Sequence, residues 1–412
     1  MLFLDGRQEF EVVYKKRRAK MSVLALVSAV AGFVKIRYIV EKAIIDNLIF
    51  RLHYRVTTAI LFVACVMITA NSLIGDPISC IYDDGLSRDV INTYCWITYT
   101  FTLPGQTGEV GTHVAHPGVA NDLVPGVEKR YHAYYQWVPF MLFFQGVLFY
   151  VPHWFWKNWE DGKIRHLTEG LRGASIMIGP DKAARTNRLV QYIIDSLHRH
   201  NMYASGYYLC ELFNFINVIG NMFLIDTFLG GAFMTYGTEV IKFSGQNQEQ
   251  RTDPMVAVFP RVTKCTFHKY GPSGSIQRHD VLCVLALNIL NEKIYIFLWF
   301  WFIILAILSG LALVYSTAIV LLPSIREIIL IRRFRFGTPA GVSALIRKTQ
   351  VGDFLLLHFL GQNLDMMVFG ELLDELSRKL HLGNNVPTAP STLELSPIYP
   401  SSKLRMHMET EA

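Results

Sequence analysis

The sequence lacks the short motifs that mark common catalytic sites. Its 412 residues contain no Gly-rich phosphate loop, no His-Glu-x-x-His, no Gly-x-Ser-x-Gly and no dinucleotide-binding fingerprint. His113 and His116 are close enough in the sequence to share a metal ion, but no third ligand lies near them. We therefore expect no enzyme activity, no metal and no other cofactor. The absence of nucleic-acid-binding motifs speaks against DNA or RNA as a partner.

Charge is also scarce. Only 17% of the residues are charged whereas 51% are hydrophobic, a balance that soluble domains of this length rarely show. The apolar residues gather in four runs, and Glu211 in the third run is the only Asp, Glu, Lys or Arg among them. The runs are residues 56–74, 137–156, 203–225 and 294–322. Because roughly 20 apolar residues cross the hydrocarbon core of a bilayer, the sequence predicts four transmembrane helices.

Basic residues are unevenly distributed between the four runs. They outnumber acidic residues before the first run, in segment 157–202 and directly after Pro323, whereas acidic residues dominate segment 75–136. Since short basic segments stay on the cytoplasmic side, both termini and segment 157–202 are predicted to be cytoplasmic. Segment 226–293 is nearly balanced, and the alternation of the spans places it outside, together with segment 75–136.

The N-terminal region allows two interpretations. Lys15-Lys16-Arg17-Arg18 and the apolar stretch 21–34 imitate a signal peptide, with Ala29-Val30-Ala31 as a cleavage site. Cleavage would leave the basic residues that follow on the outer face of the first span, against the charge bias. We therefore favour an amphipathic helix on the cytoplasmic side. Residues 1–20 are interpreted as an extension, or as the product of a start codon upstream of Met21.

Cysteine is infrequent, with six residues in the chain, and four of them lie outside the spans. Cys80 and Cys95 fall in the first outer segment, and Cys265 and Cys283 in the second, where an oxidising compartment favours disulfides. Four cysteines allow three pairings, so the bridges join the two loops to each other or staple each loop locally. Neither Cys-x-x-Cys nor a histidine pair at ligand spacing accompanies them, which argues against zinc.

The two outer loops are far longer than the connections of compact proteins. In the second loop, Val262-Thr263-Lys264-Cys265-Thr266-Phe267 precedes a turn at Gly271-Pro272-Ser273-Gly274, a pattern that predicts a short disulfide-tied sheet. The chain also contains no Asn-x-Ser/Thr glycosylation site. No glycan of that kind would therefore keep these loops away from a facing membrane.

A set of motifs carries a family resemblance that covers residues 21–360. The most specific is Tyr134-Tyr135-Gln136-Trp137-Val138 at the head of the second span, where aromatic residues suit the membrane interface. The others are Asp76-Pro77-Ile78-Ser79-Cys80, Thr93-Tyr94-Cys95-Trp96, Lys264-Cys265-Thr266-Phe267, Asn291-Glu292-Lys293-Ile294-Tyr295 and Trp299-Phe300-Trp301. Together they resemble the innexins, the invertebrate gap-junction channel family.

The resemblance implies a subunit of a large-pore intercellular channel that passes ions and small metabolites at gap junctions of the plasma membrane. Subunits would form a homo- or hetero-oligomeric ring with other innexins, and the ring would dock to a second ring on the adjacent cell. The resemblance also implies that Cys80 pairs with Cys283 and Cys95 with Cys265. Two alternatives are a hemichannel that does not dock, as in pannexins, and a four-span receptor or membrane enzyme.

Polar residues within the spans are candidates for a pore wall. Because the resemblance places the N-terminal helix and the first span around the pore, the candidates are Ser22, Val23, Thr57, Thr58, Thr69, Asn71 and Ser72. In the third span one face carries Glu211, Asn214, Asn217 and Asn221, which would line water or pack helices, and we favour packing. The fourth span carries an aromatic group that we interpret as a lipid-facing wall, Trp299, Phe300, Trp301 and Phe302.

The predicted fold class is an all-α polytopic membrane protein with four transmembrane helices, disulfide-tied extracellular loops of small β content, and a helical cytoplasmic dome. Apolar periodicity predicts dome helices within 185–200, 342–360 and 369–380, and the proline-containing segment from Asn384 on predicts a disordered tail. The expected order is extension 1–20, N-terminal helix and pore mouth 21–55, span 56–74, extracellular loop 75–136, span 137–156, cytoplasmic loop 157–202, span 203–225, extracellular loop 226–293, span 294–322, and C-terminal helices and tail 323–412.

Overall fold

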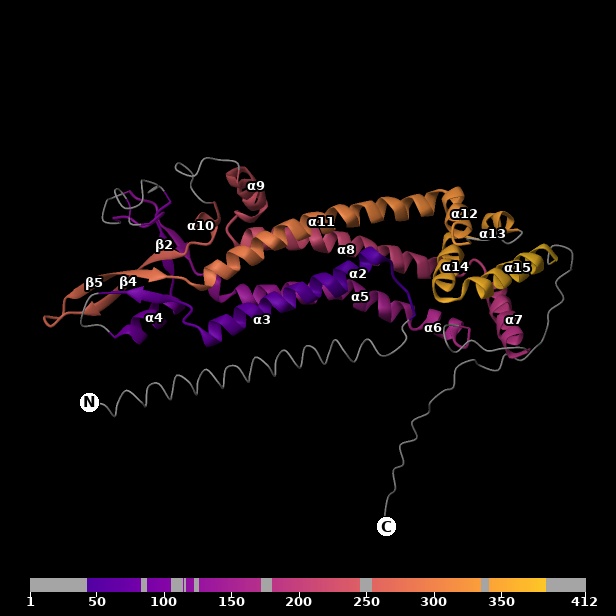
Figure 1. Cartoon of the computed structure of the whole chain (residues 1–412), viewed down its shortest axis with the longest axis horizontal. Helices are drawn as coiled ribbons and strands as arrows, with labels where there is room; N and C mark the ends of the chain where they lie inside the picture. The colour runs from indigo at the N-terminus through magenta and orange to yellow at the C-terminus, as the bar shows by residue number, and fades with distance from the viewer. Residues whose placement is uncertain are drawn as a thin grey trace, which may run out of the picture.

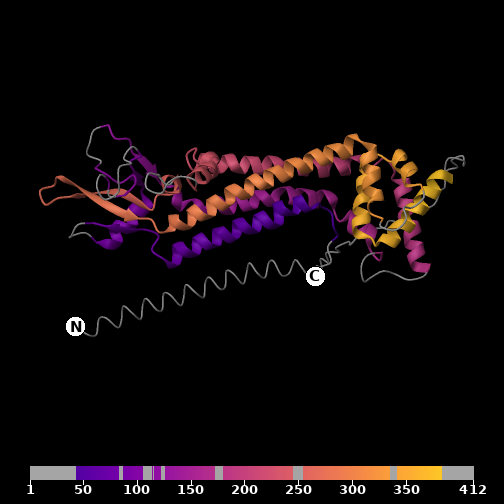
Figure 2. The same cartoon turned by 45° about the horizontal axis from the view of Figure 1, so that its top comes forward.

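The computed structural model of the chain describes residues 43–82, 87–104, 114, 116–121, 126–171, 180–244, 254–334 and 341–382. Four long helices lie lengthwise beside one another, with a β-sheet at one end and a group of shorter helices at the other (Figures 1 and 2). The expected extension 1–20, the N-terminal helix with Ser22 and Val23, and the tail from Asn384 lie outside the described residues.

The four long helices are long and apolar enough to cross a membrane. The first is built from α2 (Leu48–Arg51), the π-helical η1 (Leu52–Thr57) and α3 (Thr58–Ile74), and the others are α5 (Val138–Glu160), α8 (Asn201–Phe228) and α11 (Leu287–Leu321). All four extend beyond at least one end of the apolar runs. The reason is that hydropathy marks only the charge-free part, whereas the helical backbone continues into polar residues at the membrane boundary.

Local chemistry fixes where these helices begin and end. The Asn47 side chain caps α2 by accepting a hydrogen bond from the Phe50 backbone N–H at 2.6 Å. At the same end of the bundle, next to the shorter helices, Leu322 is extended and Pro323 opens the next helix, α12 (Pro323–Ile331). A residue before proline avoids the α conformation, which explains why α11 stops there.

The exposed surface of the long helices is apolar. Large hydrophobic side chains are exposed along α5 and α11, among them Phe140, Phe143, Ile304, Ile307 and Val314. Inside the bundle, a separate buried cluster joins all four helices and includes Leu61, Phe149, Met222 and Phe302. Helices that are apolar both on their exposed surface and in the bundle interior are typical of a bundle surrounded by lipid.

The sheet at one end has five strands in the order β1-β5-β4-β2-β3. Its strands are β1 (Ser79–Ile81), β2 (Thr100–Thr102), β3 (Arg130–His132), β4 (Val262–Tyr270) and β5 (Ile276–Val284). The predicted hairpin is present as β4 and β5, closed where the Gly271 N–H donates to Ser275 O at 2.8 Å. Strands from the first loop flank this hairpin on both sides, so the two loops form one structure. The same end holds α4 (Arg88–Ile97), η2 (Tyr134–Gln136), α9 (Phe233–Ser244) and α10 (Pro254–Val258).

The opposite end is a helical dome, as the periodicity predicts. It contains α6 (Lys163–Thr168), α7 (Pro180–Asp195), α12, α13 (Val342–Lys348), α14 (Val351–Asn363) and α15 (Met366–Leu382). These helices share one buried cluster with the adjacent ends of the long helices, including Trp156, Tyr207, Phe359 and Phe369. The dome is therefore packed onto the bundle through a continuous apolar core.

Candidate functional site

Two disulfides hold the sheet end together. Cys80 is bonded to Cys283 and Cys95 to Cys265, which is the pairing that the family resemblance implies. Cys80 and Cys283 face each other across strands β1 and β5, and all four cysteines are buried. The sulfur atoms of Cys80, Cys95 and Cys283 lie within 4.8 Å of one another, so the two bridges are adjacent. Bonded to each other in this way, they are structural bridges and offer no thiolates to a metal ion.

The signature at the head of the second span contacts these bridges. The Tyr135 hydroxyl donates to the Cys95 carbonyl oxygen at 3.2 Å, and the Gln136 amide donates to the Trp96 carbonyl oxygen. The Tyr134 hydroxyl donates to Val258 O at 3.2 Å in α10. Burial raises the pKa of Tyr135 to about 12, which keeps this donor protonated. The motif thus fastens the start of α5 to both loops, whereas the Trp137 side chain is exposed.

The β4–β5 hairpin is the outermost element of the sheet end and projects away from the bundle (Figure 1). Tyr270 and Ile276 are cross-strand neighbours at its tip, and they are 75% and 67% exposed. Large apolar side chains on a tip held by two disulfides are typical of a contact surface rather than of a solvated turn.

The polar residues of the first helix separate into two groups. Thr57 is buried and accepts a hydrogen bond from Trp301 Nε1 at 2.9 Å, and the buried Thr58 hydroxyl donates to Gly146 O at 3.3 Å. These two side chains pack against α11 and α5 of the same chain, so we withdraw them from the pore candidates. Thr69, Asn71 and Ser72 are wholly or partly exposed and remain candidates.

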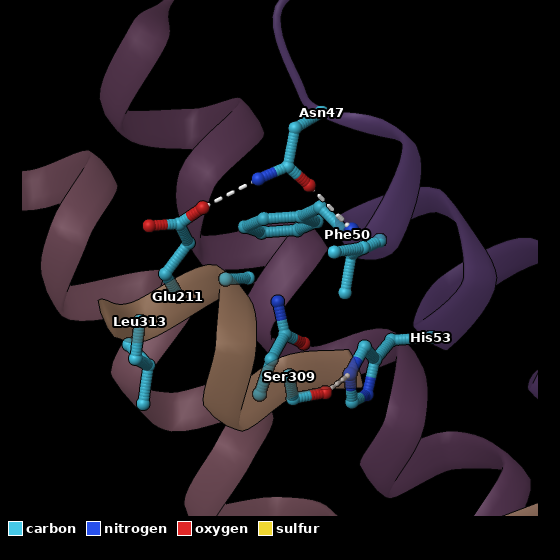
Figure 3. A pocket seen from close by; sticks show the side chains of 9 residues that line it. Asn47, Phe50, His53, Glu211, Ser309 and Leu313 are labelled. Atoms are coloured by element: carbon cyan, nitrogen blue, oxygen red, sulfur yellow. Dashed lines mark hydrogen bonds between the residues drawn. The ribbon is translucent and has the colours of Figure 1, made fainter. Parts of the chain in front are cut away.

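A small pocket that contains several polar side chains lies where the first helix meets α8 and α11 (Figure 3). The Glu211 carboxylate accepts hydrogen bonds from Asn47 Nδ2 and from Ser316 Oγ, both at 2.5 Å. The same Asn47 side chain caps α2, so Glu211 holds the start of the first helix to the third and fourth. Across the pocket, the His53 ring nitrogen Nε2 and the Ser309 hydroxyl share a hydrogen bond of 2.7 Å.

The polar face of the third span therefore lies mainly within the helix bundle. Glu211, Asn214 and Asn221 are buried, and Asn221 donates to the Asn217 side chain at 3.0 Å. This location agrees with helix packing, the interpretation that we favoured over a pore wall. Intramembrane polar groups are costly to expose to lipid, which explains why they face neighbouring helices.

The lipid-facing interpretation of the fourth-span aromatics is wrong for Trp299 and Phe302, which are buried. Trp299 Nε1 donates to Met234 O at 3.2 Å, and its ring covers Gly237, where a Cβ atom would lie 2.2 Å from the ring. Phe302 packs on Phe149 with ring centroids 5.4 Å apart. Residues three apart share a helix face, and here that face meets α5 and α9.

A carboxylate in the dome that is not among the predicted site residues joins two segments far apart in the sequence. Asp353 is buried at the start of α14, where it lies 3.0 Å from His200 Nδ1 and accepts from the His198 backbone N–H at 3.1 Å. Burial raises the pKa of Asp353, but hydrogen bonds from His200, Gln350 and His198 outweigh it and bring this pKa below its usual value. The capping-box spacing of Gln350 and Asp353 is the signal that could have revealed it.

Comparison with known proteins is consistent with this architecture. The innexin family model matches residues 46–380. Innexin inx3 of Drosophila melanogaster is 58% identical over 385 residues, which are 92% of this chain and 97% of that protein. Innexin inx2 of the same species is 48% identical over 352 residues, 85% of this chain and 95% of that protein. Innexin shaking-B of Drosophila melanogaster is 43% identical over 336 residues, 81% of this chain and 90% of that protein.

Proposed function

The chain belongs to the innexin family, and from this membership we propose that its rings dock end to end to form intercellular channels. It is a gap-junction channel subunit of the cell membrane, and it forms oligomers with other innexin subunits. Membership in this family indicates a channel rather than an enzyme. The further steps of the proposal are the docking of two rings, the placement of the termini and the lining of the pore.

The observation that carries docking is the disulfide-tied sheet. Strands from two loops that are far apart in the sequence form one sheet, and two bridges link its strands and α4. A preorganised surface loses less conformational entropy on binding than a mobile loop does. The exposed Tyr270 and Ile276 at its tip supply the apolar area that an association of two identical rings needs.

Electrophysiology on paired cells tests docking directly. We expect dual voltage clamp to find junctional current between two cells that both express the chain, and Tyr270→Asp with Ile276→Asp to abolish it. The matched control is Ile81→Asp, because Ile81 is also 67% exposed but lies on edge strand β1. Membrane currents in single cells should survive in all variants. Current in single cells without any coupling of wild-type pairs would refute docking and favour the hemichannel.

We propose that the dome, both termini and segment 157–202 face the cytoplasm, and that the sheet faces outward. The distribution of basic residues supports this orientation. The pore wall is proposed to include Thr69, Asn71 and Ser72 of the first span, with Ser22 and Val23 of the N-terminal segment at the inner mouth. With this orientation and this pore wall, we also propose the order of spans, loops and terminal segments that the sequence predicts.

A further inference from the structure

Arg55 is the only Asp, Glu, Lys or Arg of the first helix between Arg51 and Asp76, and its side chain is exposed. Its Nε donates to the Tyr54 hydroxyl at 3.1 Å, and that hydroxyl donates to the Asp46 carboxylate at 2.8 Å. The same carboxylate is paired with Arg51, whose Nε lies 2.6 Å away. Within the described parts of the chain no salt bridge involves Arg55, so its positive charge is not compensated there.

Two side-chain contacts give the depth of Arg55 in the helix bundle. Two residues before it, His53 Nε2 and Ser309 Oγ share a hydrogen bond of 2.7 Å. Two residues after it, Thr57 accepts a hydrogen bond from Trp301 Nε1 at 2.9 Å. Because Arg55 lies between these two contacts, it is level with the middle of α11, which belongs to the charge-free fourth span.

The surface of α11 is apolar at this depth. Ile304 and Ile307 lie between the two contacts and are 51% and 59% exposed, and Leu311 is exposed one turn further towards the dome. Hydrocarbon is therefore expected against α11 at the level of Arg55. A guanidinium exposed to hydrocarbon is costly, so charged side chains within spans face protein or water. Figure 1 shows α3 and α11 along opposite edges of the bundle, and we expect the edge that carries the exposed Arg55 to face water.

Arg55 begins a row of exposed residues along the first helix. Four exposed residues follow it at four-residue spacing, Ala59, Val63, Met67 and Asn71. Residues four apart are neighbours on the surface of a helix, so the row forms one continuous strip. Asn71 belongs to the pore wall given under Proposed function. The strip therefore connects Arg55, near the dome end of the helix, with a residue of that wall near the sheet end.

We propose that Arg55 of every subunit faces the pore, and that the resulting ring of positive charge makes the channel favour anions over cations. The proposal rests on the pore wall given under Proposed function, to which the first helix contributes. The symmetry of a ring of subunits repeats the same residue at one depth. Such a ring attracts anions and repels cations within about a Debye length, ~8 Å at physiological salt. Chloride and small metabolites with carboxylate or phosphate groups then pass more readily than cations of the same size.

The ion selectivity of the full-length protein in planar lipid bilayers tests the site. Undocked rings are recorded under a KCl gradient, and the reversal potential gives the permeability ratio of chloride to potassium. We expect the wild type to favour chloride, Arg55→Gln to lower the ratio at least about twofold and Arg55→Glu to reverse the preference. Arg55→Lys keeps the charge and should keep the ratio. The matched control is Lys157→Gln, which removes a positive charge from an exposed position of α5 and should leave the ratio unchanged.

Two further measurements separate an effect of charge from a structural role. Raising the salt to about 1 M shortens the Debye length to ~3 Å, so the chloride preference of the wild type should shrink while the ratio of Arg55→Gln stays nearly constant. Arg55→Cys should react with a water-soluble, negatively charged thiol reagent and shift towards potassium as it does so. Treated wild type, which keeps the free Cys65 and Cys210, is the control. Because one channel is recorded before and after the reagent, this comparison holds even where Arg55→Gln does not assemble.

Equal permeability ratios in the wild type and Arg55→Gln would overturn the proposal, and so would a wild-type ratio that salt leaves unchanged. Reaction of Arg55→Cys without any change in selectivity would contradict this inference alone. Open channels in which that cysteine does not react would place the side chain against lipid or a neighbouring subunit, and would also contradict the pore wall given under Proposed function. The recorded rings are undocked, so docking succeeds or fails separately, in the coupling of paired cells.

Discussion

Removing one disulfide should weaken the sheet less than removing the second one. The bridges span 203 and 170 residues of sequence, so with one bridge in place the other closes a ring of only their difference, 33 residues. From loop-closure entropy, removing the first bridge should lower the free energy of unfolding by about 4 kcal/mol, and removing the second by about 5 kcal/mol more. These are upper values, because the membrane spans already keep the loop ends near each other.

Hydrogen exchange of the β4 and β5 amides measures this stability in the full-length protein. Replacing both Cys95 and Cys265 by Ser leaves no odd thiol, and we expect opening of the strands to become up to about a thousandfold easier. Replacing Cys80 and Cys283 instead should give a similar increase, because the same ring is involved. Loss of all four should exceed the sum of the two pair effects. Unchanged exchange after loss of either bridge would refute the reasoning, and so would strictly additive effects.

Three further predictions concern other parts of the chain. Gly237→Ala should destabilise the protein by about 1–3 kcal/mol in thermal unfolding because its Cβ would meet the Trp299 ring, whereas Gly220→Ala, with open space around it, should be tolerated. Burial, reinforced by Arg333, lowers the pKa of His358 to about 4, so dome stability should fall as pH drops from about 6.5 towards 4; His358→Phe should flatten that dependence, and an unchanged slope would contradict it. An epitope tag in segment 105–111 should be accessible in intact cells and one in segment 179–186 only after permeabilisation, and the reverse pattern would invert the proposed topology.

The four long helices could be predicted because a helix that crosses a bilayer needs about 20 apolar residues with little charge. This signal lies within one continuous stretch of sequence. The residues at which these helices begin and end could not be predicted. The first helix continues back to Leu48 through Arg51, whose Nε lies 2.6 Å from Asp46, and hydropathy does not register such an ion pair. The β4–β5 hairpin was also predictable, since alternation and a Gly-Pro-Ser-Gly turn are local signals.

The remaining features depend on contacts between distant residues. Strands β1, β2 and β3 have three residues each. Strands β1 and β2 form along the two edges of the β4–β5 hairpin, and β3 pairs with β2. Composition shows that Trp299 and Phe302 are apolar, but only the position of Gly237 and Phe149 shows that they face protein instead of lipid. Asp353 likewise acquires its importance from His200, which is 153 positions away in the sequence.

The arrangement of the sheet also has a consequence for biosynthesis. The first-loop strands flank a hairpin that is translated much later, and 170 positions separate Cys95 from Cys265. At the usual 5–20 residues per second, the ribosome needs roughly 10–35 s to cover that distance. During this interval Cys80 and Cys95 are the only cysteines of the two outer loops that have been made, although they are not bonded to each other in the finished protein. We therefore expect newly made chains to pass through a Cys80–Cys95 bridge and to depend on a disulfide isomerase to exchange it once the hairpin arrives.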